Sequence, residues 1–72
     1  MLKVMNALWA SMLGEDAVFE LYGHFWSVKV NKKRTKVVVY SERGRIAVLH
    51  TEDRTLVDLT KSIAGLCEHL KF

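Results

Sequence analysis

The sequence predicts an α+β fold, in which a four-stranded antiparallel meander has one helix before it and one after it, in the order α-β-β-β-β-α. Three observations predict this fold class. Residues 17–50 contain four apolar segments with alternating polar positions, separated by polar or glycine-containing turns. The segments on either side have apolar residues at helical spacing instead. Two helices laid side by side cover the width of four strands, so we expect both on one face of the sheet.

The length and composition indicate one small domain covering residues 1–72. The chain has one cysteine, so it can form no internal disulfide, and it has no cluster of the kind that holds structural zinc. It also contains no proline. Half of its residues are hydrophobic, which predicts a compact body. No apolar run reaches the roughly 18 residues of a membrane span, so we expect no membrane partner. The single Cys67 is consistent with a reducing, cytoplasmic location.

Residues 2–13 form the first predicted helix. At about 100° per residue, its large apolar side chains fall within half of the circumference, and we expect this stripe to pack in the core. The stripe contains Leu2, Val4, Met5, Leu8, Trp9, Met12 and Leu13, and the other half contains Lys3, Asn6, Ala7, Ala10 and Ser11. Gly14 then suits the left-handed backbone conformation that often ends a helix.

The four predicted strands cover about residues 17–22, 25–30, 35–41 and 45–50. The turns between them are expected at residues 23–24, 31–34 and 41–44. The segment that precedes Gly23 also fits helical spacing, with Asp16 as a cap and Gly23 as a stop. We favour a strand there, because it explains why the apolar positions change from odd to even numbers across Gly23.

These turns set a register that opposes one apolar residue to another. The predicted cross-strand pairs are Phe19–Val28, Leu21–Trp26, Trp26–Val39, Val28–Val37, Val39–Ile46 and Val37–Val48. Because opposed residues share a face and alternate residues return to it, the register gathers the large apolar side chains on one side. That predicted core face contains Phe19, Leu21, Trp26, Val28, Val30, Val37, Val39, Ile46 and Val48.

The opposite face of the predicted sheet combines aromatic and charged side chains. One row across it contains Tyr22, Phe25, Tyr40 and Arg45. In the same register Lys29 lies opposite Lys36, an unfavourable pair unless both are solvated or share an anion. A face with this composition is too charged for a second core, and we expect function there.

Residues 54–70 form the second predicted helix. Its apolar residues occupy an arc of about 100°, the width of one buried face, and are Leu56, Leu59, Ile63, Leu66, Cys67 and Leu70. Asp53 or Thr55 can cap this helix, and Thr55 with Asp58 resembles a capping box. Gly65 is unusual on the polar side, where it costs about 1 kcal/mol relative to alanine. Either it is merely tolerated, or another backbone approaches it.

No catalytic or metal-binding pattern emerges from the sequence. The three histidines, His24, His50 and His69, lie in a turn, at a strand end and in a helix, and none has metal-ligand spacing to another ligand. Cys67 lies on the buried stripe of its helix, where a thiol has neither exposure nor an activating base. We therefore expect no enzyme, no metal, no cofactor and no small-molecule substrate.

Most of the basic residues lie between residues 29 and 45. Within this segment Glu42 is the acidic residue among many cations, whereas the whole chain has a formal net charge of only +3. Such a local positive potential attracts phosphates or an acidic protein surface. The candidate binding residues are Lys29, Lys32, Lys33, Arg34, Lys36, Arg43 and Arg45, together with the aromatic residues Tyr22, Phe25 and Tyr40.

Two functions suit these residues. In the first, a single-stranded nucleic acid stacks its bases on the aromatic side chains and places its phosphates near the cations. In the second, the same face is a protein interface, either between two copies of this chain or as a small regulator or inhibitor docked on an acidic partner. The predicted Lys29–Lys36 pair argues against a symmetric contact, because two copies would bring four cations together. We expect a non-enzymatic binding module and favour nucleic acid as its partner.

Overall fold

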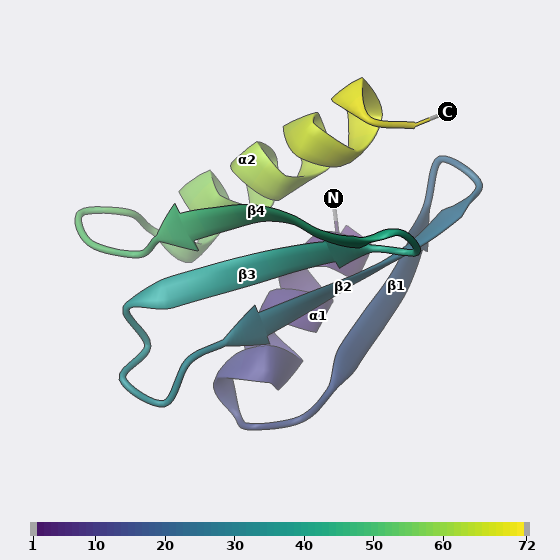
Figure 1. Ribbon diagram of the computed structural model, residues 1–72. Coiled ribbons are helices and arrows are strands. Elements are labelled where there is room, and N and C mark those ends of the chain that lie inside the picture. The colour runs from purple at the N-terminus through teal and green to yellow at the C-terminus, as the bar shows by residue number, and fades with distance from the viewer. Residues whose placement is uncertain (1, 72) are drawn as a thin grey trace.

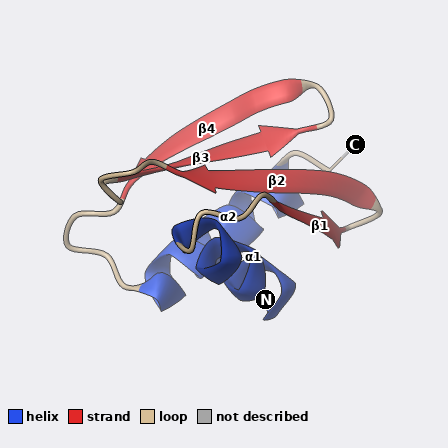
Figure 2. Ribbon diagram, turned by 90° about the horizontal axis from the view of Figure 1, so that it is seen from below, coloured by secondary structure: helices blue, strands red, loops and turns tan. Residues whose placement is uncertain are grey.

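The computed structural model describes residues 2–71 and contains two helices and four strands. In chain order they are α1 (Leu2–Met12), β1 (Ala17–Leu21), β2 (His24–Val30), β3 (Lys36–Ser41), β4 (Gly44–His50) and α2 (Leu56–His69). The strands form one antiparallel sheet in the order β1-β2-β3-β4. Both helices lie on the same side of this sheet (Figures 1 and 2). The predicted fold class and element order are confirmed, including the strand that begins at Ala17.

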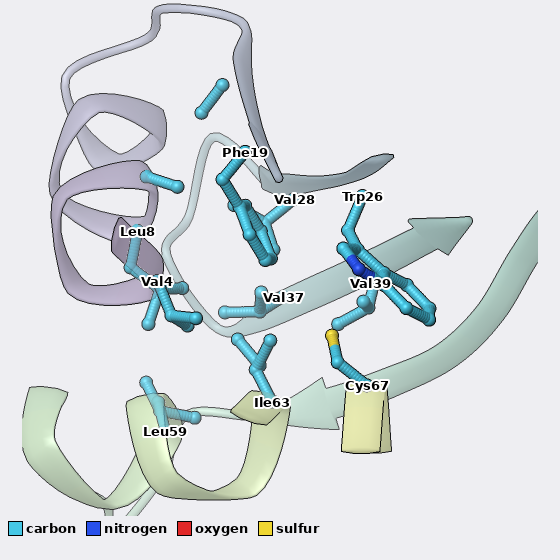
Figure 3. Packing of buried hydrophobic residues seen from close by; sticks show 12 residues of the cluster. Val4, Leu8, Phe19, Trp26, Val28, Val37, Val39, Leu59, Ile63 and Cys67 are labelled. Carbon is cyan, nitrogen blue, oxygen red and sulfur yellow. The ribbon is translucent and has the colours of Figure 1, made fainter. Parts of the chain in front are cut away.

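The hydrophobic core lies between the helices and the sheet. Side chains from both layers meet there, and the fully buried ones include Leu8, Val37, Val39, Leu59 and Ile63 (Figure 3). The ring nitrogen of the buried Trp26 donates a hydrogen bond of 2.9 Å to the carbonyl oxygen of Leu21. This bond satisfies the indole N–H, which would be costly to bury unpaired.

The buried face of α1 differs from the predicted one. It consists of Val4, Ala7, Leu8 and Ser11, whereas the predicted core residues Leu2, Trp9 and Leu13 are exposed. The small side chains of Ala7 and Ser11 let the helix approach the sheet closely. The Ser11 hydroxyl donates to the carbonyl oxygen of Val28 at 3.1 Å and accepts from the N–H of Val30 at 3.0 Å. The hydroxyl therefore hydrogen-bonds backbone groups of β2 at the point where its pairing with β1 ends, at Ala17 and Val28.

The C-terminus of α1 has the predicted glycine stop. Gly14 has a φ of +87°, its N–H donates to the carbonyl of Ser11, and the N–H of Glu15 donates to that of Ala10. This pair of bonds is the Schellman arrangement, which satisfies carbonyls at the end of a helix. The left-handed backbone turns the chain away from the helix axis and toward β1.

The first two hairpins are shifted by two residues from the predicted register. The first turn consists of Tyr22 and Gly23, both with positive φ as a type I′ turn requires, and it places Phe19 opposite Trp26. In the second hairpin Val28 pairs with Val39. A shift of two residues changes the cross-strand partners but keeps every side chain on its face. The predicted core faces of β1, β2 and β3 are therefore unaffected.

The third hairpin shifts by one residue, and the predicted face of β4 is consequently wrong. Tyr40 pairs with Arg45, but Val39 pairs with Ala47, so Ile46 is an extra residue in β4. This bulge turns Val48 away from the helices, where it is 40% exposed. Ala47 and Leu49 pack against the core in its place, and Ile46 remains partly buried against it.

Helix α2 begins with the predicted capping box. The Thr55 hydroxyl accepts from the N–H of Asp58, and the Asp58 carboxylate accepts from the N–H of Thr55. The buried face of the helix includes Ile63 and Cys67. Burial raises the pKa of the Cys67 thiol to about 11, so this side chain is a neutral core residue at physiological pH.

Candidate functional site: the open sheet face

The sheet has one face that no helix covers, which we name the open sheet face. It is turned toward the viewer in Figure 1 and upward in Figure 2. The alternation of side chains along the strands and the register of the pairs define its members. They are Val18, Glu20, Phe25, Ser27, Lys29, Lys36, Val38, Tyr40, Arg45, Val48 and His50.

Apolar and aromatic side chains occupy much of the open sheet face. Ser27 is the cross-strand neighbour of both Val18 and Tyr40, and Tyr40 is in turn opposite Arg45. Phe25 lies two residues from Ser27 on β2, so it is a diagonal neighbour of Tyr40 at about 7–8 Å between backbones. Phe25 is 56% exposed and Val18 is 68% exposed, which is unusual for large apolar residues.

A side-chain carboxylate fixes the backbone at Phe25. The last pair between β2 and β3 is Trp26 with Ser41, so Phe25 has no partner residue on β3. Its N–H donates to Oε1 of Glu42 at 3.1 Å. Glu42 is the acidic residue of the basic segment, and this bond orients its carboxylate toward the end of β2.

The cations of the face lie apart from one another, contrary to the sequence-based register. Lys29 pairs with Val38 rather than with Lys36, and Lys36 pairs with His50. The predicted lysine–lysine opposition is therefore wrong. Together with Arg45, the two lysines lie on three different strands instead of forming one repulsive pair, and all three are exposed. The argument against a symmetric contact through this face is removed with the pair.

Tyr22 does not belong to the open sheet face. It lies in the turn between β1 and β2 with a φ of +54°. The ammonium group of Lys71, which follows α2, lies 4.8 Å from the centroid of its ring. This cation–π contact places Tyr22 toward the helical side, so the predicted row of three aromatic residues contains two.

The basic residues of the two connecting segments lie at opposite ends of the sheet. Arg43 is in the turn between β3 and β4, at the same end as Phe25, and the Lys32-Lys33-Arg34 loop is at the other end (Figure 1). The Thr51 hydroxyl donates to the Arg34 carbonyl at 2.7 Å, which joins this loop to the segment between β4 and α2. Glu52 and Asp53 follow directly, and they lower the positive potential there.

A shallow hollow lies where β1 and β2 meet on the open sheet face. Its volume is about 360 Å³, and its lining includes Asp16, Val18, Ser27, Lys29 and Tyr40. The hollow therefore combines apolar walls with one cation and one carboxylate within a small area.

A second uncovered apolar surface lies on α1, and the sequence analysis missed it. It consists of Leu2, Trp9 and Leu13, which are 71%, 59% and 62% exposed, and we name it the outer stripe of α1. The signal was the width of the apolar arc, which covers half of the helix and exceeds the roughly 100° that one contact buries.

Comparisons with known proteins add no functional information. No protein-family model, no curated protein and no solved structure matches this chain. Within residues 2–71, no group of three or more His, Cys, Asp or Glu side chains is arranged to hold a metal ion. In the same described part of the chain, no helix has the length and apolar character needed to cross a membrane.

Proposed function

We propose that this protein is a non-enzymatic binding module that holds single-stranded nucleic acid on its open sheet face. The observation that carries the proposal is the combination of exposed Phe25, partly buried Tyr40 and the exposed cations Lys29, Lys36 and Arg45 on a surface that the fold leaves uncovered. Bases have flat apolar faces, and stacking on an aromatic side chain contributes about 1–3 kcal/mol per base. A duplex has its bases already stacked, so a single strand is the better ligand.

Phosphate contacts supply the second part of the proposal. Lys29, Lys36 and Arg45 are exposed and lie on three different strands of the face. A strand whose bases meet the aromatic residues therefore has cations on several sides for its phosphates. The Lys32-Lys33-Arg34 loop is expected to contribute less, because acidic residues of the neighbouring segment accompany it. We further propose a cytoplasmic location, which the single, buried Cys67 supports.

The test is a titration of the protein with short, mixed-sequence single-stranded oligonucleotides at several salt concentrations. Each phosphate contact adds about 0.7 to the steepness of the salt dependence of log K for single strands. Changing Lys29, Lys36 and Arg45 to serine is expected to weaken binding and to flatten that slope by roughly 2.

The matched control for this test is Lys61→Ser, which removes an exposed cation from α2 on the other side of the molecule. This variant is expected to bind like the unchanged protein. A slope that is equal in the triple variant and the unchanged protein contradicts the proposal, and so does the absence of binding at low salt. Equal affinity for a duplex of the same length means that charge alone is recognised.

A protein ligand is the second candidate, because the register places Val38 opposite Val48 on the open sheet face. These residues give the face an apolar area beside the aromatic one, as an interface core requires. An acidic protein surface, on which this chain acts as a small regulator or inhibitor, suits the surrounding cations. Val48→Ser is expected to weaken docking of such a protein strongly while leaving oligonucleotide affinity nearly unchanged, which separates the two candidates in one pair of titrations.

A further inference from the structure

Helix α1 has two apolar faces that point in nearly opposite directions. Val4, Leu8 and Ser11 face the core. At about 100° per residue, the outer stripe of Leu2, Trp9 and Leu13 lies roughly half a turn away from them. Single exposed apolar residues are ordinary, but three large ones aligned on one helix face form a patch. The fold therefore uses one face of α1 and leaves the other without a partner.

The spacing of the outer stripe is that of a helix-pairing seam. Leu2 and Trp9 of the stripe alternate with Met5 and Met12 at its border, and these four residues are separated by three and four residues in turn, as the a and d positions of a heptad are. Met5 and Met12 are half-buried at the border between the core and the stripe. Lys3 is the charged residue of α1, so covering the stripe does not bury several charges.

We propose that the outer stripe of α1 pairs with the same stripe of a second copy of this chain, with the two helices antiparallel about a two-fold axis. The charges around the stripe favour this occupant and this direction. Lys3 lies at the start of α1, and Glu15 and Asp16, both exposed, follow its end. An antiparallel pair brings Leu2 of one copy beside Leu13 of the other and directs each Lys3 toward the acidic pair of its partner.

The other direction and the other environment are less favourable. Parallel helices place Lys3 beside Lys3 and align the two helix dipoles, whereas antiparallel helices oppose the dipoles. A helix that lies on a membrane surface is rich in Lys and Arg around its apolar face, and α1 has Lys3 alone, with two carboxylates after its end. A two-fold contact needs a self-complementary patch, and a cation at one end with anions at the other provides it.

The inferred dimer is expected to be weak and concentration-dependent. A helix of 11 residues is about 16 Å long, and a contact of that length buries less than the roughly 800 Å² per partner of a standard interface. The outer stripe faces away from the sheet, so pairing leaves the open sheet face of each copy uncovered. The inference does not depend on nucleic-acid binding, and a dimer without such binding remains consistent with it.

The test is sedimentation equilibrium over a wide range of protein concentration. The unchanged protein is expected to show a reversible monomer–dimer equilibrium. Changing Trp9→Gln and Leu13→Gln is expected to give a monomer throughout with an unchanged circular dichroism spectrum, because both side chains are already exposed. Lys3→Glu is expected to weaken the dimer, and adding Glu15→Lys and Asp16→Lys to it is expected to restore the dimer.

Two control variants separate this contact from others. Val57→Gln removes an exposed apolar residue from α2, and Phe25→Ser removes one from the open sheet face, and both are expected to leave the dimer intact. The proposal is overturned if the unchanged protein is a monomer at every concentration. It is also overturned if the dimer survives the two α1 changes, or is lost on Phe25→Ser. If the glutamine variant does not fold, the proposal is tested by the charge variants alone. It is then overturned if Lys3→Glu leaves the dimer unchanged, or if adding Glu15→Lys and Asp16→Lys does not restore the dimer.

The direction of the pairing has a separate test in disulfide crosslinking. A Leu2→Cys variant mixed with a Leu13→Cys variant is expected to form crosslinked heterodimers, and neither variant alone is expected to crosslink. The native Cys67 is fully buried, so it does not interfere. Crosslinking of the Leu2→Cys variant with itself contradicts the antiparallel arrangement, because only parallel helices bring those positions together.

Discussion

The open sheet face and the outer stripe of α1 are both apolar surfaces that the fold leaves uncovered, but they differ in the charges around them. Tyr40 lies on a face with cations contributed by three strands, and Phe25 has Glu20 opposite it on β1 and the Glu42 carboxylate at its N–H. Trp9 lies on a helix whose charged residue is Lys3, with acidic residues beyond its end. An exposed aromatic side chain indicates a contact in both cases, and the neighbouring charges indicate what kind of partner fits. The cations of the open sheet face, Lys29, Lys36 and Arg45, outnumber its acidic member, Glu20, and this excess suits a polyanion, whereas a balanced pattern suits a second copy.

The largest expected effect tests whether the aromatic residues of the open sheet face act as a stacking surface. Changing Phe25→Ser and Tyr40→Ser is expected to weaken binding of a single-stranded oligonucleotide by about 1–3 kcal/mol for each base that loses its ring. Fluorescence titration measures the affinity, and circular dichroism checks that the fold is intact. The two side chains are outside the core, so the variant is expected to fold.

The chain offers a matched aromatic control for this test. Tyr22→Ser removes a tyrosine that is 43% exposed but lies in a turn beneath Lys71, outside the open sheet face. Its affinity for the oligonucleotide is expected to equal that of the unchanged protein. A similar loss of oligonucleotide affinity in both variants means that any exposed aromatic residue contributes to binding, whether or not it lies on the open sheet face. Unfolding of the Phe25 and Tyr40 variant means that this face contributes to the core.

A smaller effect distinguishes the two faces of α1. Ser11→Ala removes the hydroxyl that hydrogen-bonds the carbonyl of Val28 and the N–H of Val30, and these buried and partly buried backbone groups lose that partner. We expect the free energy of unfolding to fall by about 1–3 kcal/mol. Urea denaturation measures this change, with Trp9→Gln at low protein concentration as the comparison. That substitution on the outer stripe is expected to change stability little, and equal losses contradict the assignment of the two faces.

The order of the helices and strands could be predicted from the sequence, because the spacing of apolar residues that distinguishes a helix from a strand is a property of neighbouring residues. The faces of β1, β2 and β3 also followed, since the errors in register were shifts of two residues, which preserve the alternation. The face of β4 did not follow. One extra residue at Ile46 reverses the alternation beyond it; Gly44 suits a bulged hairpin loop, but the local composition does not place the extra residue at Ile46.

The candidate site was predicted less completely than the fold. Tyr22 was assigned to the wrong surface because tyrosine seldom adopts positive φ, and only the observed turn at Tyr22 and Gly23 reveals it. The buried face of α1 was assigned by the size of its side chains. In the structure the buried face instead includes Ser11, whose hydroxyl hydrogen-bonds the sheet. These bonds join residues far apart in the sequence, so helical periodicity cannot predict them. Leu2, Trp9 and Leu13 consequently emerged as a surface only with the structure.

The smallest expected effect concerns Gly65, on the exposed side of α2. A methyl group added there meets no atom of this chain within 4 Å, and the backbone is helical without a positive φ. Gly65→Ala is therefore expected to raise the free energy of unfolding by about 1 kcal/mol, the difference in helix propensity between the two residues. Thermal denaturation measures the stability of this variant, and sedimentation measures its association.

Higher stability with unchanged association means that the outer face of α2 has no close partner, in contrast to that of α1. Higher stability with weakened association means that a second backbone approaches α2 at Gly65, and the dimer contact then extends across both helices.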